Sequence, residues 1–368
     1  MNDYRPTPKL FLVIPHLGGG GAERVVALLA QHLDSSRFEI HLAVLLQDLP
    51  GALPIPASVL VHRFHASRVR YALFKLLRLV WRERPEIVLS GIAHLNFLVL
   101  AFRLFLPRRT RLVVRQSTMA SAASGIGTRI LYRVLYPWAA GIICQSEAMG
   151  DDLASNFWIA RRKITVLANP IKPLVGTSQV SAEEGGSPLL LCVSRLSKEK
   201  GVDLLLRAFV KVKRHFQNAR LTILGTGPEV KRLRSLSQQL NLASSIEFAG
   251  YADPEEFYSD STLFVSSSRY EGMPNALLEA AAAGLPIVAT PSSEGVTRLL
   301  GASPGTWTAK EVSADDLAQS LLEALNYLEQ LPVTSRRFRH AFIAPFAVTT
   351  AVHAYEQVLL GIDRTGQP

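Results

Sequence analysis

The stretch from Ser261 to Gly284 places the strongest limit on how this chain can fold. A short apolar run, Ser261–Ser266, comes first, and runs of this length between turn residues are typical of buried strands. A polar loop follows, and then a helix-forming series in which Pro274 suits the first turn and Gly284 is a stop signal. The stretch therefore predicts a strand, a loop and a helix, with Glu271 in the loop and Glu279 about two turns into the helix.

The start of this helix predicts a binding site. The N–H groups of Met273 to Leu277 are expected to lack acceptors and to point past the strand ends, where they suit phosphate. The carboxylates of Glu271 and Glu279 suit hydroxyl groups instead, because a carboxylate accepts hydrogen bonds. Phosphate and hydroxyl groups together describe a sugar nucleotide.

The motif E-G-x-P-N-A-x-L-E, from Glu271 to Glu279, resembles the acidic motif of family 4 retaining glycosyltransferases of GT-B fold. The resemblance implies that Glu271 contacts the hydroxyls of the donor sugar and that Glu279 contacts the ribose. It also implies donor contacts along the whole start of the helix, at Gly272, Met273, Pro274, Asn275, Ala276 and Leu277. The alternative is an ordinary amphipathic helix whose two carboxylates are there by chance.

A second motif, R-L-x-x-x-K-G, runs from Arg195 to Gly201 after the predicted strand 189–193. It resembles the family motif in which the arginine and the lysine bind the donor diphosphate. Two cations would offset the charge that builds on a leaving diphosphate, so no metal ion and no other cofactor is expected. The alternative is a solvated basic loop.

Two further turns resemble donor contacts of the same family. Gly225 begins a G-x-G-P turn after the predicted strand 220–224. Tyr251 ends the predicted strand and turn 246–251, whose family counterpart lies against the base. Both are candidate donor-binding residues by resemblance.

The first half of the chain carries a weaker match. The string G-G-A-E-R-V, after the predicted strand 9–14, resembles a family loop that faces the donor phosphate and the acceptor, which makes Gly20 and Gly21 candidates, although a plain loop explains the glycines equally well. His94 is expected in the loop 92–96, at the end of a strand, as a catalytic-site residue, and the alternative is a structural histidine. The family's usual histidine would fall near Gln116, so either His94 or Gln116 could take its place.

Alternating strands and helices on both sides of residue 175 predict an α/β protein. By resemblance it is a GT-B fold, with two doubly wound Rossmann-like domains facing a cleft. We expect an acceptor-binding domain over 1–172, a linker over 172–187, and a nucleotide-sugar-binding domain over 173–345. The helix within 346–368 is expected to cross back to the first domain.

The excess of positive charge is confined to the first half of the chain. Residues 1–170 hold 21 Lys and Arg against 10 Asp and Glu, whereas the remainder holds 19 against 20. This asymmetry predicts an anionic partner, and the absence of a recognisable nucleic-acid module favours a membrane surface over nucleic acid. Aromatic and aliphatic residues, among them Tyr132, Leu135, Tyr136 and Trp138, accompany the basic ones, as at an interfacial surface.

The remaining sequence features fit a cytoplasmic protein. No apolar run approaches the roughly 20 residues that a membrane span needs, and the polar N-terminus does not suit a signal peptide. Cys144 and Cys192 lie in apolar runs and are predicted to be buried thiols. No cluster of Cys and His has metal-ligand spacing.

The first functional hypothesis is a retaining glycosyltransferase. It would move a hexose or an N-acetylhexosamine from a UDP-linked donor to a lipid-linked or glycan acceptor in cell-surface polysaccharide assembly, peripherally at the inner face of the cytoplasmic membrane. Glu271, Arg195, Lys200 and His94 would form its catalytic site. The alternatives are a sugar-nucleotide 2-epimerase of the same fold and a catalytically silent sugar-nucleotide-binding subunit.

Overall fold

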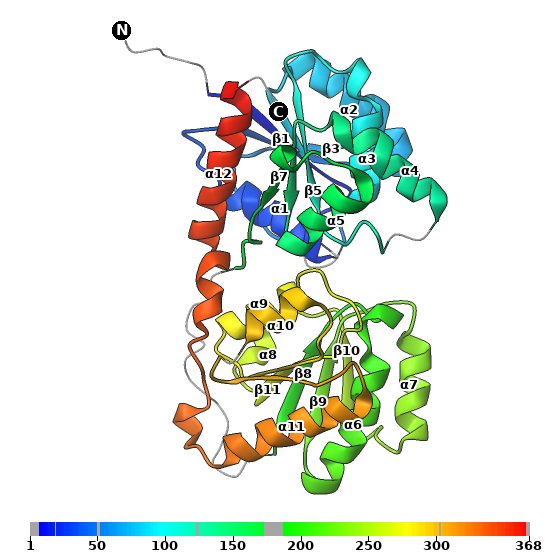
Figure 1. The fold of residues 1–368 in the computed structure, drawn as a ribbon, viewed down its shortest axis with the longest axis vertical. Helices are drawn as coiled ribbons and strands as arrows, with labels where there is room; N and C mark the ends of the chain where they lie inside the picture. Colours follow the sequence, from blue (N-terminus) through cyan, green and yellow to red (C-terminus); the bar gives the residue numbers. More distant parts are fainter. Residues whose placement is uncertain are drawn as a thin grey trace. The chain divides into compact units, whose positions relative to one another are not determined.

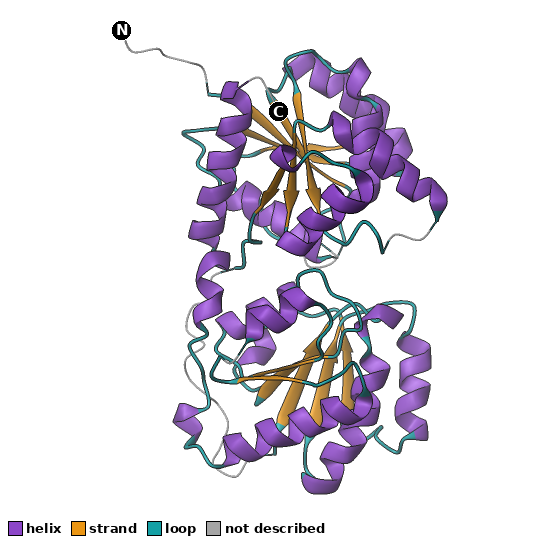
Figure 2. Ribbon diagram, viewed as in Figure 1, coloured by secondary structure: helices purple, strands orange, loops and turns teal. Residues whose placement is uncertain are grey.

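The computed structural model describes residues 7–18, 20–49, 52–122, 125–172, 187–301 and 303–365. The chain divides into two compact units, the first formed by residues 1–171 with 345–368 and the second by residues 172–344. Each unit is a parallel sheet between two layers of helices (Figures 1 and 2). Most of the predicted linker, residues 173–186, lies outside the described residues.

Seven parallel strands form the sheet of the first unit, in the order β3-β2-β1-β4-β5-β6-β7. The strands are β1 (Lys9–Ile14), β2 (Glu39–Val44), β3 (Leu60–Arg63), β4 (Ile87–Ser90), β5 (Arg111–Gln116), β6 (Gly141–Cys144) and β7 (Ile164–Val166). The inner strands are apolar along most of their length because helices cover both of their faces. In β1, Phe11 and Val13 contact one hydrophobic core, while Leu10, Leu12 and Ile14 contact the other.

Helices of the first unit cover the two faces unequally. The first face carries α2 (Val69–Glu83), α3 (Ala93–Ala101), α4 (Ile126–Leu135) and α5 (Glu147–Phe157), with the short turns η1 (Arg103–Phe105) and η2 (Tyr136–Trp138). The second face carries α1 (Gly21–His32) and α12 (Val348–Thr365), which lie side by side (Figure 1). The fully buried Tyr355 of α12 accepts a hydrogen bond from Arg115 Nε at 3.2 Å, which fixes this last helix to β5.

Six parallel strands form the sheet of the second unit, in the order β10-β9-β8-β11-β12-β13. The strands are β8 (Leu189–Val193), β9 (Arg220–Leu224), β10 (Ile246–Gly250), β11 (Leu263–Ser266), β12 (Ile287–Ala289) and β13 (Thr306–Thr308). One face is covered by α6 (Val202–His215), α7 (Val230–Gln239) and α11 (Ala314–Glu329). The other is covered by α8 (Glu255–Tyr258), α9 (Asn275–Ala282) and α10 (Glu294–Leu300).

Both sheets reverse their strand order at one point. In the first unit β1 lies beside β4, and in the second unit β8 lies beside β11. Open parallel sheets bind ligands outside the carboxyl ends of the strands at such a switch point. The loops that follow β8 and β11, residues 194–201 and 267–274, therefore frame the expected ligand position of the second unit.

Three local predictions are wrong. Residues 92–96 are not a loop, because α3 begins at Ala93 and its buried Asn96 donates to the carbonyl oxygen of Arg115 at 3.0 Å. Glu279 is the fifth residue of α9 and so lies little more than one turn into that helix. Tyr132, Leu135 and Tyr136, expected at an interfacial surface, are buried in the first core, whereas Trp138 is 42% exposed.

Candidate functional site

The loops that follow β8 and β11 are held against each other through the backbone. Gly201, after β8, has φ +60°, and a Cβ atom there would lie 2.0 Å from the carbonyl oxygen of Ser267. Ser267 Oγ donates to the carbonyl oxygen of Lys200 at 3.0 Å, and the Arg269 N–H donates to that of Glu199 at 2.7 Å. The glycine of the R-L-x-x-x-K-G motif is thus required by the close approach of the second loop.

This contact brings together two of the predicted residues. Lys200 Nζ forms an ion pair with Glu271 Oε2, and Ser268 Oγ donates to the same oxygen at 3.3 Å. The two side chains are 22% and 15% exposed, so the pair is reached by water from one side only. Partial burial strengthens the attraction between the charges, because less water screens them.

Arg195 lies on the same loop as Lys200. Its side chain is exposed and makes no hydrogen bond or ion pair with another described residue, which leaves its donors available to a ligand. The loop leans on the turn after β9, where Leu196 N–H donates to the carbonyl oxygen of Thr226 at 2.8 Å. A Cβ atom on Gly225 would lie 1.9 Å from the carbonyl oxygen of Ser194, so backbone packing alone already requires this glycine.

An arginine–aspartate fork, which the sequence did not reveal, supports both loops. Arg269 donates from Nη1 and Nη2 to the two carboxylate oxygens of Asp203 at 2.8 and 2.9 Å, and Nη1 also donates to the carbonyl oxygen of Lys198 at 2.9 Å. The hydrogen bonds from Arg269 lower the pKa of the Asp203 carboxyl. Asp203 is the second residue of α6, and Arg269 lies 66 positions further along the chain, so no local pattern pairs them.

The start of α9 is partly as expected. The Asn275 N–H donates to the carbonyl oxygen of Met273 at 3.1 Å, so the prediction that all amides from Met273 to Leu277 are unpaired is wrong at Asn275. It also fails at Pro274, which has no N–H. The amides of Ala276 and Leu277 fall in the first turn and have no acceptor inside the helix. Glu279, one turn further on, is 8% exposed.

The other predicted donor contacts surround these residues. Gly272 lies in the loop that carries Glu271, and Pro274 is the N-cap of α9, with φ −84° and ψ 85°. Tyr251 follows β10 and is 44% exposed. Because β8, β9, β10 and β11 are parallel, the loops that carry Arg195, Gly225, Tyr251 and Glu271 all leave the same edge of the sheet.

The switch point of the first unit has a different chemistry. Gly20 is the N-cap of α1, and a Cβ atom there would lie 2.4 Å from Glu23 Oε2, so the Glu23 carboxylate folds back over the start of the helix. A carboxylate in this place offsets the positive end of the helix dipole and would repel a phosphate near Gly20 and Gly21. His16 Nε2 lies 3.9 Å from Glu23 Oε1.

Gln116 and His94, the two candidates for the place of the family's usual histidine, differ in exposure: Gln116 is buried and His94 is exposed. Gln116 is fully buried, where it donates to Tyr132 OH at 2.8 Å and to the carbonyl oxygen of Thr118 at 2.7 Å and accepts from Tyr136 OH at 2.5 Å. Gln116 is thus a core residue with both amide protons used. His94 lies in the first turn of α3, where desolvation lowers its pKa and the charge of Glu23 opposes that effect.

Comparisons with known proteins agree with this arrangement. The family model described as glycosyl transferases group 1 matches residues 177–337, and that of glycosyltransferase family 4 matches residues 19–173. The N-acetylgalactosamine-N,N'-diacetylbacillosaminyl-diphospho-undecaprenol 4-alpha-N-acetylgalactosaminyltransferase of Campylobacter jejuni is 29% identical over 315 residues, which cover 80% of this chain and 83% of the relative.

Two solved structures are similar along their length. HepE of Anabaena, solved with UDP and glucose, superposes with a TM-score of 0.77 at 16% sequence identity. The superposition covers 96% of this chain and 99% of the HepE chain. The sucrose-phosphate synthase of Thermosynechococcus elongatus superposes with a TM-score of 0.78 at 15% identity, with coverage of 96% and 99%. These similarities and the two parallel sheets show a two-domain Rossmann-like GT-B fold.

Proposed function

We propose that this chain, which belongs to the group 1 and family 4 glycosyltransferases, transfers a hexose or an N-acetylhexosamine from a nucleotide-diphosphate sugar to a hydroxyl acceptor. The transfer retains the configuration of the sugar. One observation carries the proposal: at the switch point of the second sheet, Lys200 is in contact with Glu271, and the loop of Lys200 also carries the exposed Arg195. A uridine nucleotide is our choice of donor base, because the structurally similar HepE was solved with UDP.

Each residue has a distinct part in the proposed reaction. Arg195 binds diphosphate oxygens through its forked guanidinium, and Lys200 approaches them as a compact charge. Glu271 accepts hydrogen bonds from the sugar hydroxyls, while Glu279 holds the ribose. The bond from the anomeric carbon to the diphosphate oxygen breaks, the acceptor oxygen bonds to that carbon from the same side, and its proton passes to the departing diphosphate.

The two cations make a metal ion unnecessary in this scheme. Charge develops on the leaving oxygens in the transition state, and preorganised cations stabilise it there. Lys200 is already positioned through its loop contacts with Ser267. We therefore expect transfer to continue unchanged when a chelator such as EDTA is added, and a loss that added Mg²⁺ or Mn²⁺ restores would contradict metal independence.

The proposal is tested by replacing the paired residues. Lys200→Ala and Glu271→Ala are each expected to lower kcat by about 10²- to 10³-fold, the usual effect of removing one transition-state contact. Lys198→Ala is the matched control, because Lys198 is an exposed cation in the same turn and only its backbone oxygen takes part in the loop contacts. Full activity in both test variants would end the proposal.

The acceptor is proposed to be a lipid-linked glycan in cell-surface polysaccharide assembly, at the inner face of the cytoplasmic membrane. The name of the Campylobacter jejuni relative contains a diphospho-undecaprenol acceptor, and the excess of Lys and Arg in residues 1–170 suits an anionic surface. No helix in the described part of the chain has both the length and the apolar character needed to cross a bilayer. Transfer to polyprenyl-diphosphate glycans but not to the free glycans is the expected result.

A further inference from the structure

A basic groove lies between β3 and α2 in the first unit. It has a volume of about 360 Å³ and is lined by His62, Arg63, Phe64, Lys75, Arg78, Leu79 and Arg82. Asp48 pairs with Arg63, and Glu83 pairs with Arg82. Lys75 and Arg78 have no carboxylate partner within the described ranges, so the groove keeps a net positive charge.

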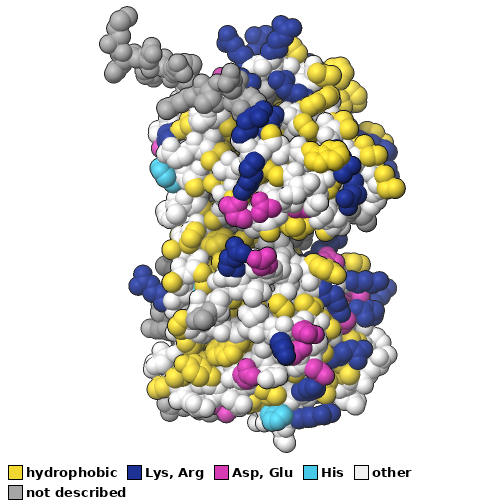
Figure 3. All heavy atoms as spheres, viewed as in Figure 1, with side chains coloured by type: hydrophobic (Ala, Val, Ile, Leu, Met, Phe, Trp, Pro, Cys, Tyr) yellow, Lys and Arg dark blue, Asp and Glu magenta, His cyan; other side chains and the backbone are white. Residues whose placement is uncertain are grey.

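An apolar belt lies about a quarter turn around α2 from Lys75 and Arg78. It is formed by Phe74, Trp81, Leu104 and Phe105, which are 73%, 52%, 77% and 63% exposed. The belt is continuous. The ring centroids of Phe74 and Phe102 lie 6.5 Å apart and those of Phe102 and Phe105 lie 6.0 Å apart, while Trp81 Nε1 donates to the carbonyl oxygen of Phe105 at 2.7 Å. Soluble proteins rarely expose large contiguous apolar patches unless the patch has a partner. Figure 3 shows apolar side chains gathered beside Lys and Arg over this part of the first unit.

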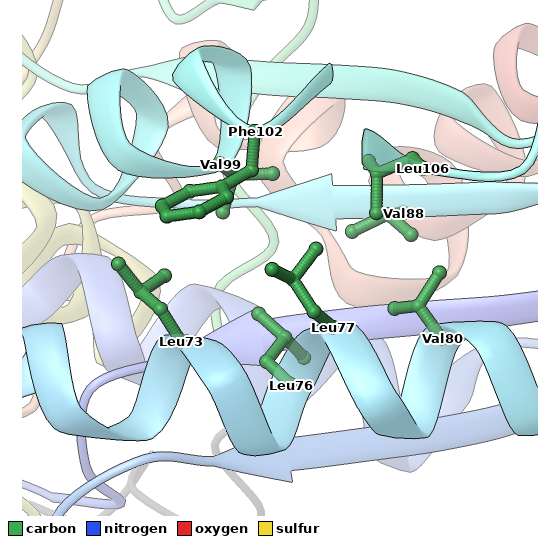
Figure 4. Close-up of a pocket in the computed structure, with 8 residues that line it drawn as sticks. All are labelled: Leu73, Leu76, Leu77, Val80, Val88, Val99, Phe102 and Leu106. Atoms are coloured by element: carbon green, nitrogen blue, oxygen red, sulfur yellow. The ribbon is translucent and has the colours of Figure 1, made fainter. Parts of the chain in front are cut away.

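The belt rests on a closely packed layer. The side chains of Leu73, Leu76, Leu77 and Val80 point from α2 toward α3 and the segment that follows it (Figure 4). The cavity between them is entirely apolar and measures about 20 Å³, close to the volume that one water molecule needs. An acyl or prenyl chain therefore has no room between these helices, and the partner of the belt must lie outside the protein.

Groove and belt together fit one partner. Aromatic side chains favour the headgroup level of a bilayer, and nearby Lys and Arg are attracted to anionic lipids. A free nucleotide or nucleic acid would leave the belt without a partner. A second copy of this chain, paired through this surface across a twofold axis, would place two net-positive grooves in one interface, where they would repel each other.

We propose that this surface docks on an anionic phospholipid bilayer, with the phosphate headgroups in the basic groove and the apolar belt in the interface. This docking proposal rests on the proposed function only for the choice of the cytoplasmic membrane. It adds which surface of the protein binds and which lipid chemistry that surface recognises. His62, which lines the groove, is held in place by His41. His41 Nδ1 lies 3.0 Å from His62 Nε2, and His41 Nε2 lies 3.0 Å from Glu39 Oε1.

Flotation with phosphatidylcholine vesicles, with and without phosphatidylglycerol, tests the groove. One basic residue near an anionic surface is worth about fivefold in affinity, so Lys75→Ser with Arg78→Ser should weaken binding to the anionic vesicles about 25-fold. The matched control is Arg207→Ser with Arg214→Ser, which removes two exposed cations from α6 and should leave binding unchanged. High salt should weaken the wild type and the control but change the groove variant much less.

A second variant tests the belt. Phe74→Ser with Trp81→Ser should reduce binding to both kinds of vesicle, whereas Tyr327→Ser, which alters a 45% exposed aromatic residue of α11, should not. Light scattering in solution gives the oligomeric state of the same proteins. A wild-type dimer that the belt variant converts to a monomer would assign the surface to self-association and overturn the proposal.

The assays also separate this inference from the proposed function. Vesicle binding is measured without nucleotide sugar, and donor turnover is measured in detergent micelles. If the groove variant floats as the wild type does while both turn over the donor, the docking surface is refuted and the function stands. If only the wild type floats and neither protein uses any nucleotide sugar, the function is refuted and the docking surface stands.

Discussion

The ammonium group of Lys200 has to serve two anions in turn. Without a ligand it pairs with Glu271, and in the proposed reaction it faces a diphosphate that carries more charge. Glu271 thus competes with the diphosphate for Lys200 and also repels it. The same carboxylate is needed to accept hydrogen bonds from the sugar hydroxyls. Glu271 therefore weakens the binding of the diphosphate product but favours the transfer reaction.

Glu271→Gln should therefore bind UDP more tightly and transfer sugar more slowly. Removing one partly exposed charge contact is worth about 1 kcal/mol, which corresponds to an affinity increase of about fivefold. Calorimetry measures the affinity and a transfer assay measures kcat. Glu294→Gln is the control, because Glu294 is exposed at the start of α10 and, among the described residues, forms its ion pair with Arg298 alone. Weaker UDP binding by the Glu271 variant would refute the competition.

The Asp203–Arg269 fork predicts a pH-dependent stability. Hydrogen bonds from Arg269 lower the pKa of Asp203 below its ordinary value of 3.8 in the folded state. The stabilisation is therefore present above the unfolded pKa and is lost as the pH falls through the folded pKa. Asp203→Asn should destabilise the second unit by about 1 kcal/mol at neutral pH. The difference from the wild type should shrink as the pH falls below 3.8 and vanish only once the pH is below the lowered pKa of the folded state.

Thermal unfolding between neutral and acidic pH measures this effect. Asp315→Asn is the matched control, since Asp315, in the first turn of α11, pairs with Lys211 but is 81% exposed and should show a smaller difference at neutral pH. A difference for Asp203→Asn that stays constant into acid would mean that the ionised carboxylate is not its cause. Because the fork holds both loops, the variant should also raise KM for the donor at neutral pH.

At the scale of elements, two glycines with similar backbone angles differ in what surrounds them. Gly201 has φ +60° and faces the carbonyl oxygen of Ser267, whereas Gly250 has φ +72° and has nothing within 4 Å of its Cβ position. Gly250→Ala should cost about 1 kcal/mol, from the backbone angle alone. Gly201→Ala should cost about 3 kcal/mol or more, because it also pushes apart the loops of Lys200 and Glu271.

Urea denaturation and the transfer assay distinguish the two glycine variants. Gly250→Ala should keep its activity under conditions in which it is folded. Gly201→Ala should lose activity even when it is folded, because the contact between Lys200 and Glu271 depends on the approach of Gly201 to Ser267. Equal stability and equal activity of the two variants would show that the contact between Gly201 and Ser267 is not needed for activity.

The elements that the sequence predicted well are those with a local signature. Strands β8 and β9 lie where their apolar runs begin and end, because parallel strands buried on both faces need such runs. The sequence failed where distant residues decide. It did not reveal that Asn96 is buried under β5, that Glu23 fills the space above Gly20, or that Arg269 reaches Asp203. Each of these depends on chain segments that only tertiary packing brings together.

At the scale of the whole molecule, the same strand order is used twice with different chemistry at each switch point. The second unit presents Arg195, Lys200 and the first-turn amides of α9. The first unit presents Glu23, His16 and His94. Cations and amides suit a diphosphate, whereas a carboxylate near imidazoles suits hydroxyls. We therefore propose that the second unit binds the donor and the first unit the acceptor.

Each unit also carries one internal reporter. Cys144 in β6 and Cys192 in β8 are free and buried, as the sequence predicted. Burial raises the pKa of Cys144 to about 12 and that of Cys192 to about 11. The thiolate is the reactive form, so neither residue should react with a thiol reagent in mildly alkaline buffer until its own unit opens.

Thiol labelling should therefore show which unit binds the nucleotide. UDP that binds the second unit stabilises it by mass action, about 2.7 kcal/mol at a hundredfold excess over Kd, and slows the labelling of Cys192 about 100-fold. Cys144 in the first unit should react at an unchanged rate. The variants Cys144→Ser and Cys192→Ser each leave one thiol and allow the two rates to be measured separately. Protection of Cys144 alone would place the nucleotide on the first unit, and equal protection of both would show that the units open together.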